Sequence, residues 1–304
     1  MSREFIQALP RKFTEVITAA FRDDGRRWIE SLPRIIRKIE ENWQVKIDSP
    51  FPNLSYHYVA PCVRAEGSEA VVKIGFPGEA KYILNERKML EYLDGGSVNR
   101  ILDFDEQRLA FLLEKLVPGE NLKTVCARNP QRAVAIAIET MRSFWQYPPS
   151  NNDFPRLEDW FEGFKKAEET RFPADYAAQA REFFDELSSA PDEKMLLHGD
   201  FHHENILSAG RRPFLAIDPK GIVGHRAYDA AVFLLNHANW LKNEPGFREK
   251  LSDAIERFSA ALEIEQRDLR RWCFAQGVLS AWWTFEDNCE NFGRDLEFTK
   301  IWEV

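Results

Sequence analysis

Cysteine is scarce in this chain, which has four in 304 residues. None of Cys62, Cys126, Cys273 and Cys289 stands in a Cys-x-x-Cys pair, so the sequence favours neither a zinc ribbon nor a disulfide framework. We therefore expect free thiols in a reducing compartment. The chain also lacks the long apolar core of a signal peptide at its start, and no run approaches the ~20 apolar residues of a membrane span. The expected location is cytoplasmic.

A basic excess is missing as well, because 41 Lys and Arg face 49 Asp and Glu, a formal net charge of −8. A general nucleic-acid-binding surface needs such an excess to neutralise phosphates, so we expect no nucleic-acid partner. The acidic balance suits a cationic small molecule better. Walker A and His-Glu-x-x-His signatures are both absent, so the run His202-His203-Glu204 does not indicate zinc catalysis.

Three polar residues stand at fixed intervals near the middle of the chain: Asp200, Asn205 five positions later, and Asp218 thirteen positions after that. Each adjoins an apolar run that is typical of a short strand. The two runs between Asn205 and Asp218 are joined by a turn at 208–211, which predicts a hairpin. A hairpin brings Asn205 and Asp218 together at its open end.

Phosphoryl transfer uses these residue types. A carboxylate takes the proton of the acceptor hydroxyl and orients that oxygen, while carboxylate and amide oxygens bind the magnesium ions on the nucleotide phosphates. The spacing therefore predicts Asp200 as the general base and Asn205 and Asp218 as Mg²⁺ ligands. A purely structural interpretation stays open, in which Asp200 and Asn205 cap turns and Asp218 ends a strand.

A lysine and a glutamate upstream form a second candidate pair. Lys73 lies in a predicted strand, where a lone lysine is usually solvated. Glu86 lies in the middle of the apolar stripe of the predicted helix 79–93. That stripe comprises Tyr82, Met89, Leu90 and Leu93. A carboxylate buried there without a cation is costly, so we expect it to pair with Lys73, as in the kinase pair that holds the nucleotide phosphates.

The periodicity of the chain changes twice. Residues 11–42 show helical spacing with a break at 23–25. Period-two runs then predict five strands, at 43–47, 56–64, 70–74, 100–104 and 109–114. After Gly119, apolar residues recur three and four positions apart. This spacing predicts helices near 121–128, 131–146, 156–169, 174–189, 227–241, 245–262 and 266–292. The predicted fold class is α+β, with a five-stranded antiparallel sheet plus helix followed by a mainly helical lobe.

Two stretches of the sequence resemble a known family. His198–Leu207 resembles the catalytic loop of the aminoglycoside phosphotransferases, which share the protein-kinase-like fold. Ala216–Asp229 is similar to one branch of them, the streptomycin 6-kinases and hydroxyurea-resistance kinases. The resemblance extends over 43–300, and its sharp motifs lie in 198–229. It implies an ATP-dependent phosphotransferase with Mg²⁺, in which GTP stays open as the nucleotide.

The resemblance also implies lobes and supporting residues. The N-terminal nucleotide-binding lobe is expected at 1–117 and the C-terminal lobe with catalytic loop and acceptor site at 118–304. Glu114, Leu116 and Val117 match by order the hinge whose backbone binds adenine. His198 is expected to order the catalytic loop. Asp229 is expected to hold the backbone of that loop, although a helix-cap or dipole role is the alternative.

One segment departs from the family pattern. The loop 48–55 contains no glycine, whereas kinases cover the phosphates with a glycine-rich loop at this place. Its prolines lack N–H donors and stiffen the backbone. Phosphate binding is therefore expected to rest more on Lys73, the magnesium ions and the hinge. The same loop is the one feature that favours an inactive nucleotide-binding pseudokinase.

The acceptor implied by the resemblance is a small cationic aminocyclitol such as streptomycin. Its guanidinium groups need carboxylates for pairing and aromatic rings for stacking. Trp282, Glu286 and Asp287, at the acidic and aromatic end of 279–290, are the predicted acceptor residues, and 158–160 is a second such cluster. Hydroxyurea and a sugar-like metabolite are the alternative acceptors. The predicted oligomeric state is a monomer or weak dimer.

Overall fold

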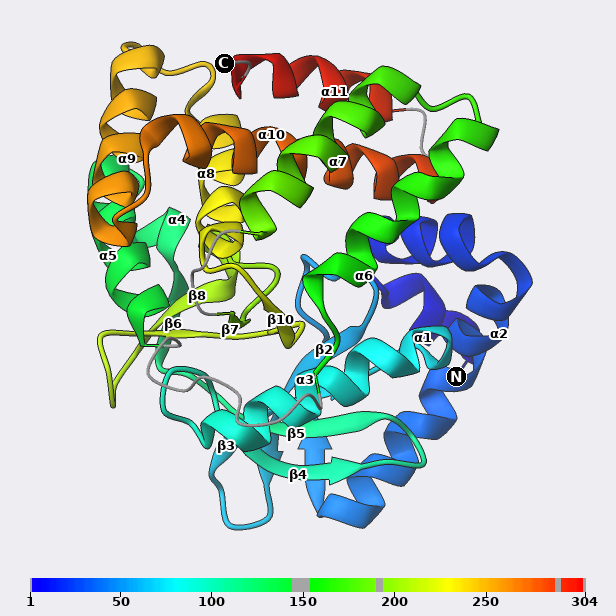
Figure 1. Ribbon diagram of the computed structural model, residues 1–304. Helices are drawn as coiled ribbons and strands as arrows, with labels where there is room; N and C mark the ends of the chain where they lie inside the picture. Colours follow the sequence, from blue (N-terminus) through cyan, green and yellow to red (C-terminus); the bar gives the residue numbers. More distant parts are fainter. Residues whose placement is uncertain (1, 144–153, 190–193, 288–290, 303–304) are drawn as a thin grey trace. The chain divides into compact units, whose positions relative to one another are not determined.

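A computed structural model describes residues 2–143, 154–189, 194–287 and 291–302 (Figure 1). Contacts within the chain define two compact units. The first comprises Met1–Gly95 and Asn99–Leu116, and the second comprises Gly96–Val98 and Val117–Val304. The division at Leu116 lies next to the predicted lobe boundary after residue 117. Within the described residues, no helix is long and apolar enough to cross a membrane.

The N-terminal unit contains the predicted five-stranded antiparallel sheet, in the order β1-β2-β3-β5-β4 (Figure 1). Its strands are β1 (Val45–Ile47), β2 (Tyr58–Arg64), β3 (Glu69–Ile74), β4 (Ile101–Asp105) and β5 (Ala110–Glu114). The turn between β2 and β3 contains Gly67 with a φ of +88°, a conformation that glycine adopts without steric cost. All five predicted strands are confirmed, with ends shifted by one or two residues.

Two helices precede the sheet, α1 (Ser2–Ala8) and α2 (Arg11–Trp43). Helix α2 is interrupted at Arg22, whose φ of 50° and ψ of −122° are not helical, one residue before the predicted break. Pro33 lies inside the helix. The buried side chains of α2 pack with those of β2, β3 and β5 in one core. This core includes Phe13, Ile17, Leu32 and Ile39 of α2 with Tyr58, Val72 and Leu112 of the sheet.

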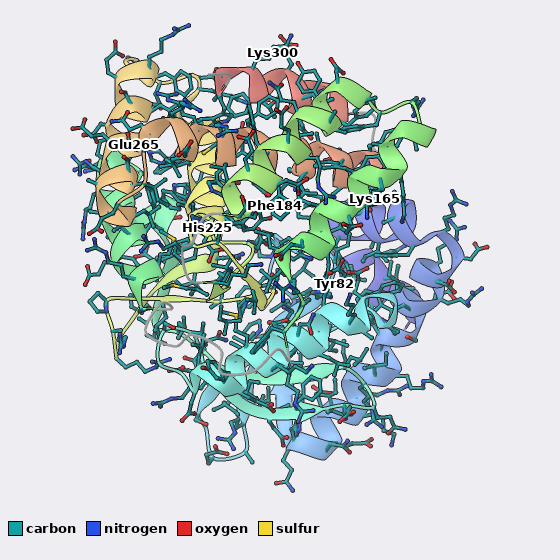
Figure 2. The ribbon with its side chains drawn as sticks, in the orientation of Figure 1. Tyr82, Lys165, Phe184, His225, Glu265 and Lys300 are labelled. Atoms are coloured by element: carbon teal, nitrogen blue, oxygen red, sulfur yellow. The ribbon has the colours of Figure 1, made fainter. Side chains whose placement is uncertain are left out.

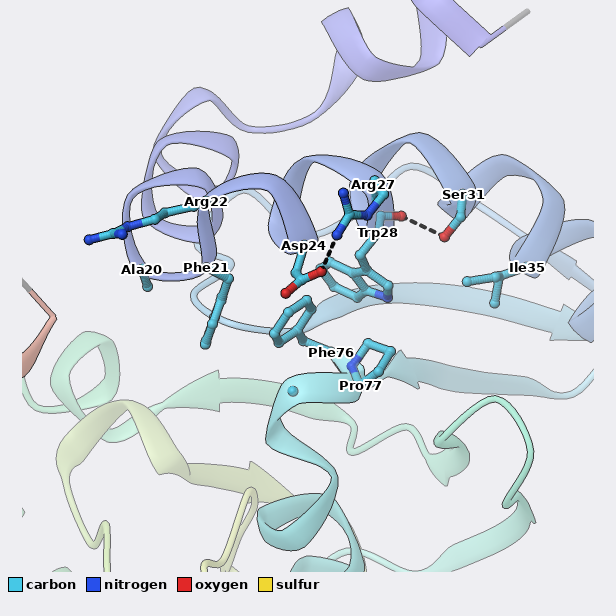
Figure 3. Close-up of a pocket in the computed structure, with 11 residues that line it drawn as sticks. Ala20, Phe21, Arg22, Asp24, Arg27, Trp28, Ser31, Ile35, Phe76 and Pro77 are labelled. Carbon is cyan, nitrogen blue, oxygen red and sulfur yellow. Dashed lines mark hydrogen bonds and ion pairs between the residues drawn. The ribbon is translucent and has the colours of Figure 1, made fainter.

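A pocket of about 750 Å³ lies beside the interruption of α2, next to the 3-10 turn η1 (Pro77–Glu79). It is lined by the rings of Phe21 and Phe76, which stack with their centroids 4.1 Å apart. It is also lined by the ion pair between Arg27 and Asp24 (Figure 3). None of the predicted site residues lines this pocket, so the candidate active site lies elsewhere.

The C-terminal unit combines two small sheets with helices (Figure 1). One sheet has the order β6-β8-β9, and the other pairs β7 with β10. These strands are β6 (Pro118–Asn121), β7 (Met195–Leu197), β8 (Ile206–Ala209), β9 (Phe214–Ala216) and β10 (Ile222–Gly224). The helices are α4 (Leu122–Val125), α5 (Pro130–Arg142), α6 (Leu157–Phe161), α7 (Ala174–Ser188), α8 (Ala227–Leu241), α9 (Phe247–Leu262), α10 (Gln266–Glu286) and α11 (Phe292–Thr299).

Two helix predictions for this unit need correction, and a third lies partly outside the described residues. The segment predicted as one helix over 156–169 is the short α6 followed by the 3-10 helix η2 (Glu162–Glu169). The helix predicted over 266–292 ends at Glu286. The helix predicted over 131–146 is α5, and positions 144–146 of that prediction lie outside the described residues.

Aromatic side chains form the core of this unit. Phe184 of α7 stacks on Phe161 with centroids 3.9 Å apart and contacts Trp272 of α10 edge-on (Figure 2). Helix α8 has buried residues on nearly every face, which is why its sequence is apolar all round rather than striped. The catalytic loop predicted at 198–207 is hydrogen-bonded to this helix through Asp229.

Candidate active site

Lys73 and Glu86 form a buried ion pair within the N-terminal unit. Lys73 Nζ lies 2.6 Å from Glu86 Oε2, and the two side chains are 6% and 4% exposed. Neighbouring residues of a strand point to opposite faces of the sheet, so Lys73 points to the face of α3 (Ala80–Leu93) while Val72 joins the core under α2. Loss of either partner would leave a buried charge without its counterion.

The apolar stripe of α3 differs from the prediction at one position. Met89, Leu90 and Leu93 are buried beside Glu86 as expected. Tyr82, which is labelled in Figure 2, lies on α3. It is 41% exposed, and Ile83 is buried in its place. The buried stripe therefore begins at Ile83, one residue later than predicted.

The catalytic loop leaves β7 through Gly199, whose φ is +81°. Asp200 follows and keeps its carboxylate 37% exposed. Asn205 ends the 3-10 turn η3 (His203–Asn205) and is buried. Its Nδ2 donates to the backbone oxygen of Asp200 at 3.0 Å and reaches Asp200 Oδ2 at 3.5 Å. The five-residue spacing thus folds into a compact loop in which Asn205 supports Asp200, the predicted base.

The hairpin of β8 and β9 then returns the chain to Asn205. Ile206 pairs with Ala216 in the antiparallel register, and the N–H of Ile217 donates to the backbone oxygen of Asn205 at 2.9 Å. The next residue, Asp218, has a φ of +58°, a left-handed conformation that aspartate tolerates better than most residues. The predicted hairpin is present and brings Asn205 and Asp218 to its open end.

The donor atoms at this end suit a hard divalent cation. Because Asn205 Nδ2 is used by Asp200, the amide oxygen Oδ1 is the atom suited to a metal, together with the carboxylate of Asp218. Mg²⁺ is commonly held by one or two protein side chains plus the phosphates of its substrate. No group of three or more His, Cys, Asp or Glu side chains with metal-binding geometry occurs among the described residues. The residues fit a Mg²⁺ ion that is bound together with a nucleotide.

Asp229 and His198 form hydrogen bonds with the backbone of the catalytic loop. The two oxygens of Asp229 accept the N–H groups of His198 and Gly199, each at 2.8 Å. Burial raises the pKa of Asp229 to about 7, and these hydrogen bonds oppose that rise. His198 Nδ1 accepts the N–H of Asp200 at 3.2 Å, so its Nε2 carries the proton toward the oxygen of Ile217 at 2.9 Å. Burial lowers the pKa of His198 to about 4, which keeps the ring neutral.

The predicted hinge residues lie at the ends of two strands. Glu114 ends β5, and its Oε2 accepts the N–H of Arg100 at 3.0 Å. Leu116 is buried, whereas Val117 is 57% exposed and leads into β6. Adenine binding by their backbone remains a prediction.

The glycine-free loop 48–55 has part of its backbone already engaged. The N–H of Asp48 donates to the oxygen of Pro61 at 2.9 Å, and that of Phe51 donates to the oxygen of Val59 at 3.0 Å. Pro50 and Pro52 have no N–H group. These residues therefore offer phosphates fewer backbone donors than a glycine-rich loop would.

Trp282 is buried in the aromatic core, and its place in the acceptor site stays a prediction. It is 2% exposed and packs against Phe172 and Phe285, with centroids 5.2 Å and 5.5 Å away. Glu286 is exposed at the end of α10, and partial burial of its carboxyl raises the pKa. Asp287 directly follows α10. Positions 288–290 of the predicted acceptor segment lie outside the described residues.

A different tryptophan lies beside the catalytic loop. Trp160, from the second cluster predicted, has its ring atom Cη2 3.0 Å from the point that a Cβ on Gly199 would occupy. It meets Trp283 edge-to-face, with centroids 5.3 Å apart and an angle of 84°. The two acids of that cluster are engaged elsewhere, since Glu158 pairs with Lys194 and Asp159 accepts the N–H of Arg156. Spacing alone did not single out Trp160, because only the tertiary fold brings it to Gly199.

Comparisons with solved structures identify the fold. The choline kinase LicA from Streptococcus pneumoniae matches with a TM-score of 0.66 at 14% identity, over 89% of this chain and 98% of that one. Aminoglycoside phosphotransferase APH(4)-Ia matches with a TM-score of 0.62 at 13% identity, over 88% and 98%. The predicted protein-kinase-like fold is confirmed.

Residues 42–288 match the model of one family, and the chain belongs to it: the aminoglycoside/hydroxyurea antibiotic resistance kinases. A streptomycin 3''-kinase of Klebsiella pneumoniae is 31% identical over 81% of this chain and 91% of its own length. A hydroxyurea phosphotransferase of Kitasatospora aureofaciens is 27% identical over 92% and 81%. A streptomycin 6-kinase of Streptomyces griseus is 24% identical over 92% and 91%. The predicted family and enzyme class, a phosphotransferase with an alcohol group as acceptor, are confirmed.

Proposed function

We propose that this protein transfers the γ-phosphate of ATP, with Mg²⁺, to a hydroxyl of a small cationic aminocyclitol such as streptomycin. The observation that carries this proposal is the convergence of Asp200, Asn205 and Asp218. Asn205 contacts Asp200 through its Nδ2 and, through the hairpin, adjoins Asp218. These are the base and metal ligands that phosphoryl transfer requires.

Each residue has a defined task in this reaction. The carboxylate of Asp200 accepts the proton of the acceptor hydroxyl and orients its oxygen toward the γ-phosphorus. Asn205 and Asp218 would hold the Mg²⁺, which neutralises charge on the phosphates when bound. In the N-terminal unit, Lys73 would bind the nucleotide phosphates while Glu86 keeps its ammonium in place. His198 and Asp229 fix the loop that carries Asp200.

An inactive pseudokinase is the less favoured alternative. All five residues of the phosphotransfer machinery are present, and Lys73 contacts Glu86 while Asn205 contacts Asp200. The glycine-free loop alone supports inactivity. Because a buried lysine–glutamate pair is costly to maintain without a function, we favour an active enzyme.

The choice of acceptor rests on the charged and aromatic side chains of the C-terminal unit and on the named activities of relatives. The exposed Glu286 and its neighbour Asp287 supply negative charge near the end of α10, and the Trp160–Trp283 pair supplies aromatic surface next to Asp200. Cationic guanidinium groups bind both kinds of surface. Hydroxyurea is the second candidate acceptor, because a relative of that named activity aligns over 92% of the chain.

The test is incubation of the purified protein with ATP, Mg²⁺ and single acceptors, followed by mass spectrometry of each acceptor. The panel contains streptomycin, a second aminocyclitol, hydroxyurea and a neutral polyol, and Asp200→Asn is the control enzyme. We expect one added phosphate on streptomycin with the wild type and a much slower reaction with the control. Phosphate on hydroxyurea or the polyol alone would contradict the acceptor, and phosphate on no acceptor would contradict the proposed function.

A further inference from the structure

Lys220 lies between the two carboxylates on which the reaction depends. Its Nζ is 3.0 Å from Asp218 Oδ2 and 3.7 Å from Asp200 Oδ2. The side chain of Lys220 is 26% exposed, that of Asp200 is 37% exposed and that of Asp218 is 30% exposed. The ammonium is thus part of a partly enclosed cluster of three charges. The sequence pattern had assigned Lys220 no role.

Backbone contacts with the catalytic loop fix the position of Lys220. The N–H of Lys220 donates to the backbone oxygen of His198 at 2.7 Å. Its Cβ lies 3.1 Å from the point that a Cβ on Gly199 would occupy, so residue 199 has to be a glycine for this close approach as well as for its positive φ. The stem of Lys220 is therefore packed against the residue that precedes the base.

Geometry places the ammonium on the path of the phosphoryl group. If Asp200 takes the acceptor proton and Asp218 holds the nucleotide through its metal, the transferred group passes between these two carboxylates. That is where Nζ lies. In the transfer, the acceptor oxygen forms a bond to the γ-phosphorus, the bond to the β-phosphate oxygen breaks, the proton goes to Asp200, and ADP leaves with the bonding electrons.

We propose that Lys220 is a catalytic cation of this enzyme, an inference that rests on the proposed function. Before the nucleotide binds, its ammonium neutralises Asp218 and competes with the metal for that carboxylate. During transfer it contacts the equatorial oxygens of the phosphoryl group and stabilises their negative charge, as fixed cations do in phosphoryl transfer.

The test compares Lys220→Met and Lys220→Arg with the wild type. Methionine keeps the apolar stem that packs on Gly199 but removes the charge, and arginine keeps the charge. We expect Lys220→Met to lower kcat by about 10²–10³, the size of losing one preorganised charged group, with KM for ATP and acceptor changed less. Lys220→Arg should recover part of kcat. Lys250→Met is the matched control, because Lys250 has a similarly exposed side chain that pairs with one carboxylate, Glu244.

A second readout needs no turnover. Mn²⁺ is titrated into the nucleotide-free protein and its binding is followed by electron paramagnetic resonance. Lys220→Met should bind Mn²⁺ several-fold more tightly than the wild type, whereas Lys250→Met should match the wild type. A kcat within about threefold of wild type for Lys220→Met, or an unchanged or weaker Mn²⁺ affinity, overturns the proposal. If the wild type phosphorylates no acceptor, the proposed function fails and so does the catalytic role of Lys220. The Mn²⁺ titration then decides only whether the ammonium competes with a metal ion for Asp218.

Discussion

Replacing Asp229 by alanine removes the acceptor of two buried N–H groups, those of His198 and Gly199. A buried donor left without a partner costs about 1–3 kcal/mol, so two cost about 2–6 kcal/mol. Removal of a buried carboxylate offsets part of this loss at pH 8, where a pKa of about 7 leaves Asp229 largely ionised. We therefore expect a net loss of about 1–4 kcal/mol in the free energy of unfolding, a sizeable part of the stability of a typical domain.

The assay is urea denaturation followed by circular dichroism, combined with steady-state kinetics. Asp185→Ala is the matched control, because Asp185 forms an exposed i,i+4 pair with Arg181 on α7, and its loss should cost less than about 0.5 kcal/mol. In the folded fraction of Asp229→Ala, kcat should fall while KM for ATP changes little, since the loop carrying Asp200 loses its anchor. Stability and kcat both within error of Asp185→Ala would refute the anchoring role.

Four further predictions concern the site and its titration. Asp200→Asn should keep nucleotide binding and lower kcat by about 10²–10⁴, the contribution of a general base; near-normal turnover would contradict that role. Asp218→Ala should lose the Mg²⁺-dependent part of ATP binding in calorimetric titrations, and an unchanged metal dependence would argue against it as a ligand. Charge reversal at Glu286 and Asp287 should raise the acceptor KM before that of ATP, and an equal change in both would remove these acids from the acceptor site. Because the pKa of Asp229 is raised by burial, the wild type should lose stability relative to Asp229→Asn as pH rises from about 4 to about 7; buried histidines common to both proteins cancel in this difference, and a flat difference would refute the raised pKa.

The hairpin and the Lys73–Glu86 pair were predictable because short-range rules govern them. Two apolar runs and a turn specify a hairpin, and this alone brings Asn205 to Asp218. A carboxylate on a buried helix face requires a cation, and the neighbouring strand carries one. The existence of the strands and helices also followed from periodicity, whereas the ends of helices did not, as at α6 and α10.

The acceptor side was less predictable because burial is a tertiary property. Trp282 and Trp283 are adjacent in sequence and have the same composition around them, yet Trp282 is enclosed by phenylalanines and Trp283 meets Trp160. Only the packing of α6 and α10 decides between them. The role of Lys220 was hidden in the same way, since its approach to Asp200 arises from the pairing of β7 with β10 and the turn between β9 and β10.

The central claim is that this site moves a phosphoryl group from ATP to a hydroxyl of a small acceptor. Phosphorus nuclear magnetic resonance of one reaction containing the protein, ATP, Mg²⁺ and streptomycin follows all phosphorus species at once. We expect the ATP signals to be replaced by those of ADP and a phosphate monoester in equal amounts, with Asp200→Asn far slower. Unchanged ATP, or ADP with inorganic phosphate and no monoester across the acceptor panel, would contradict the claim.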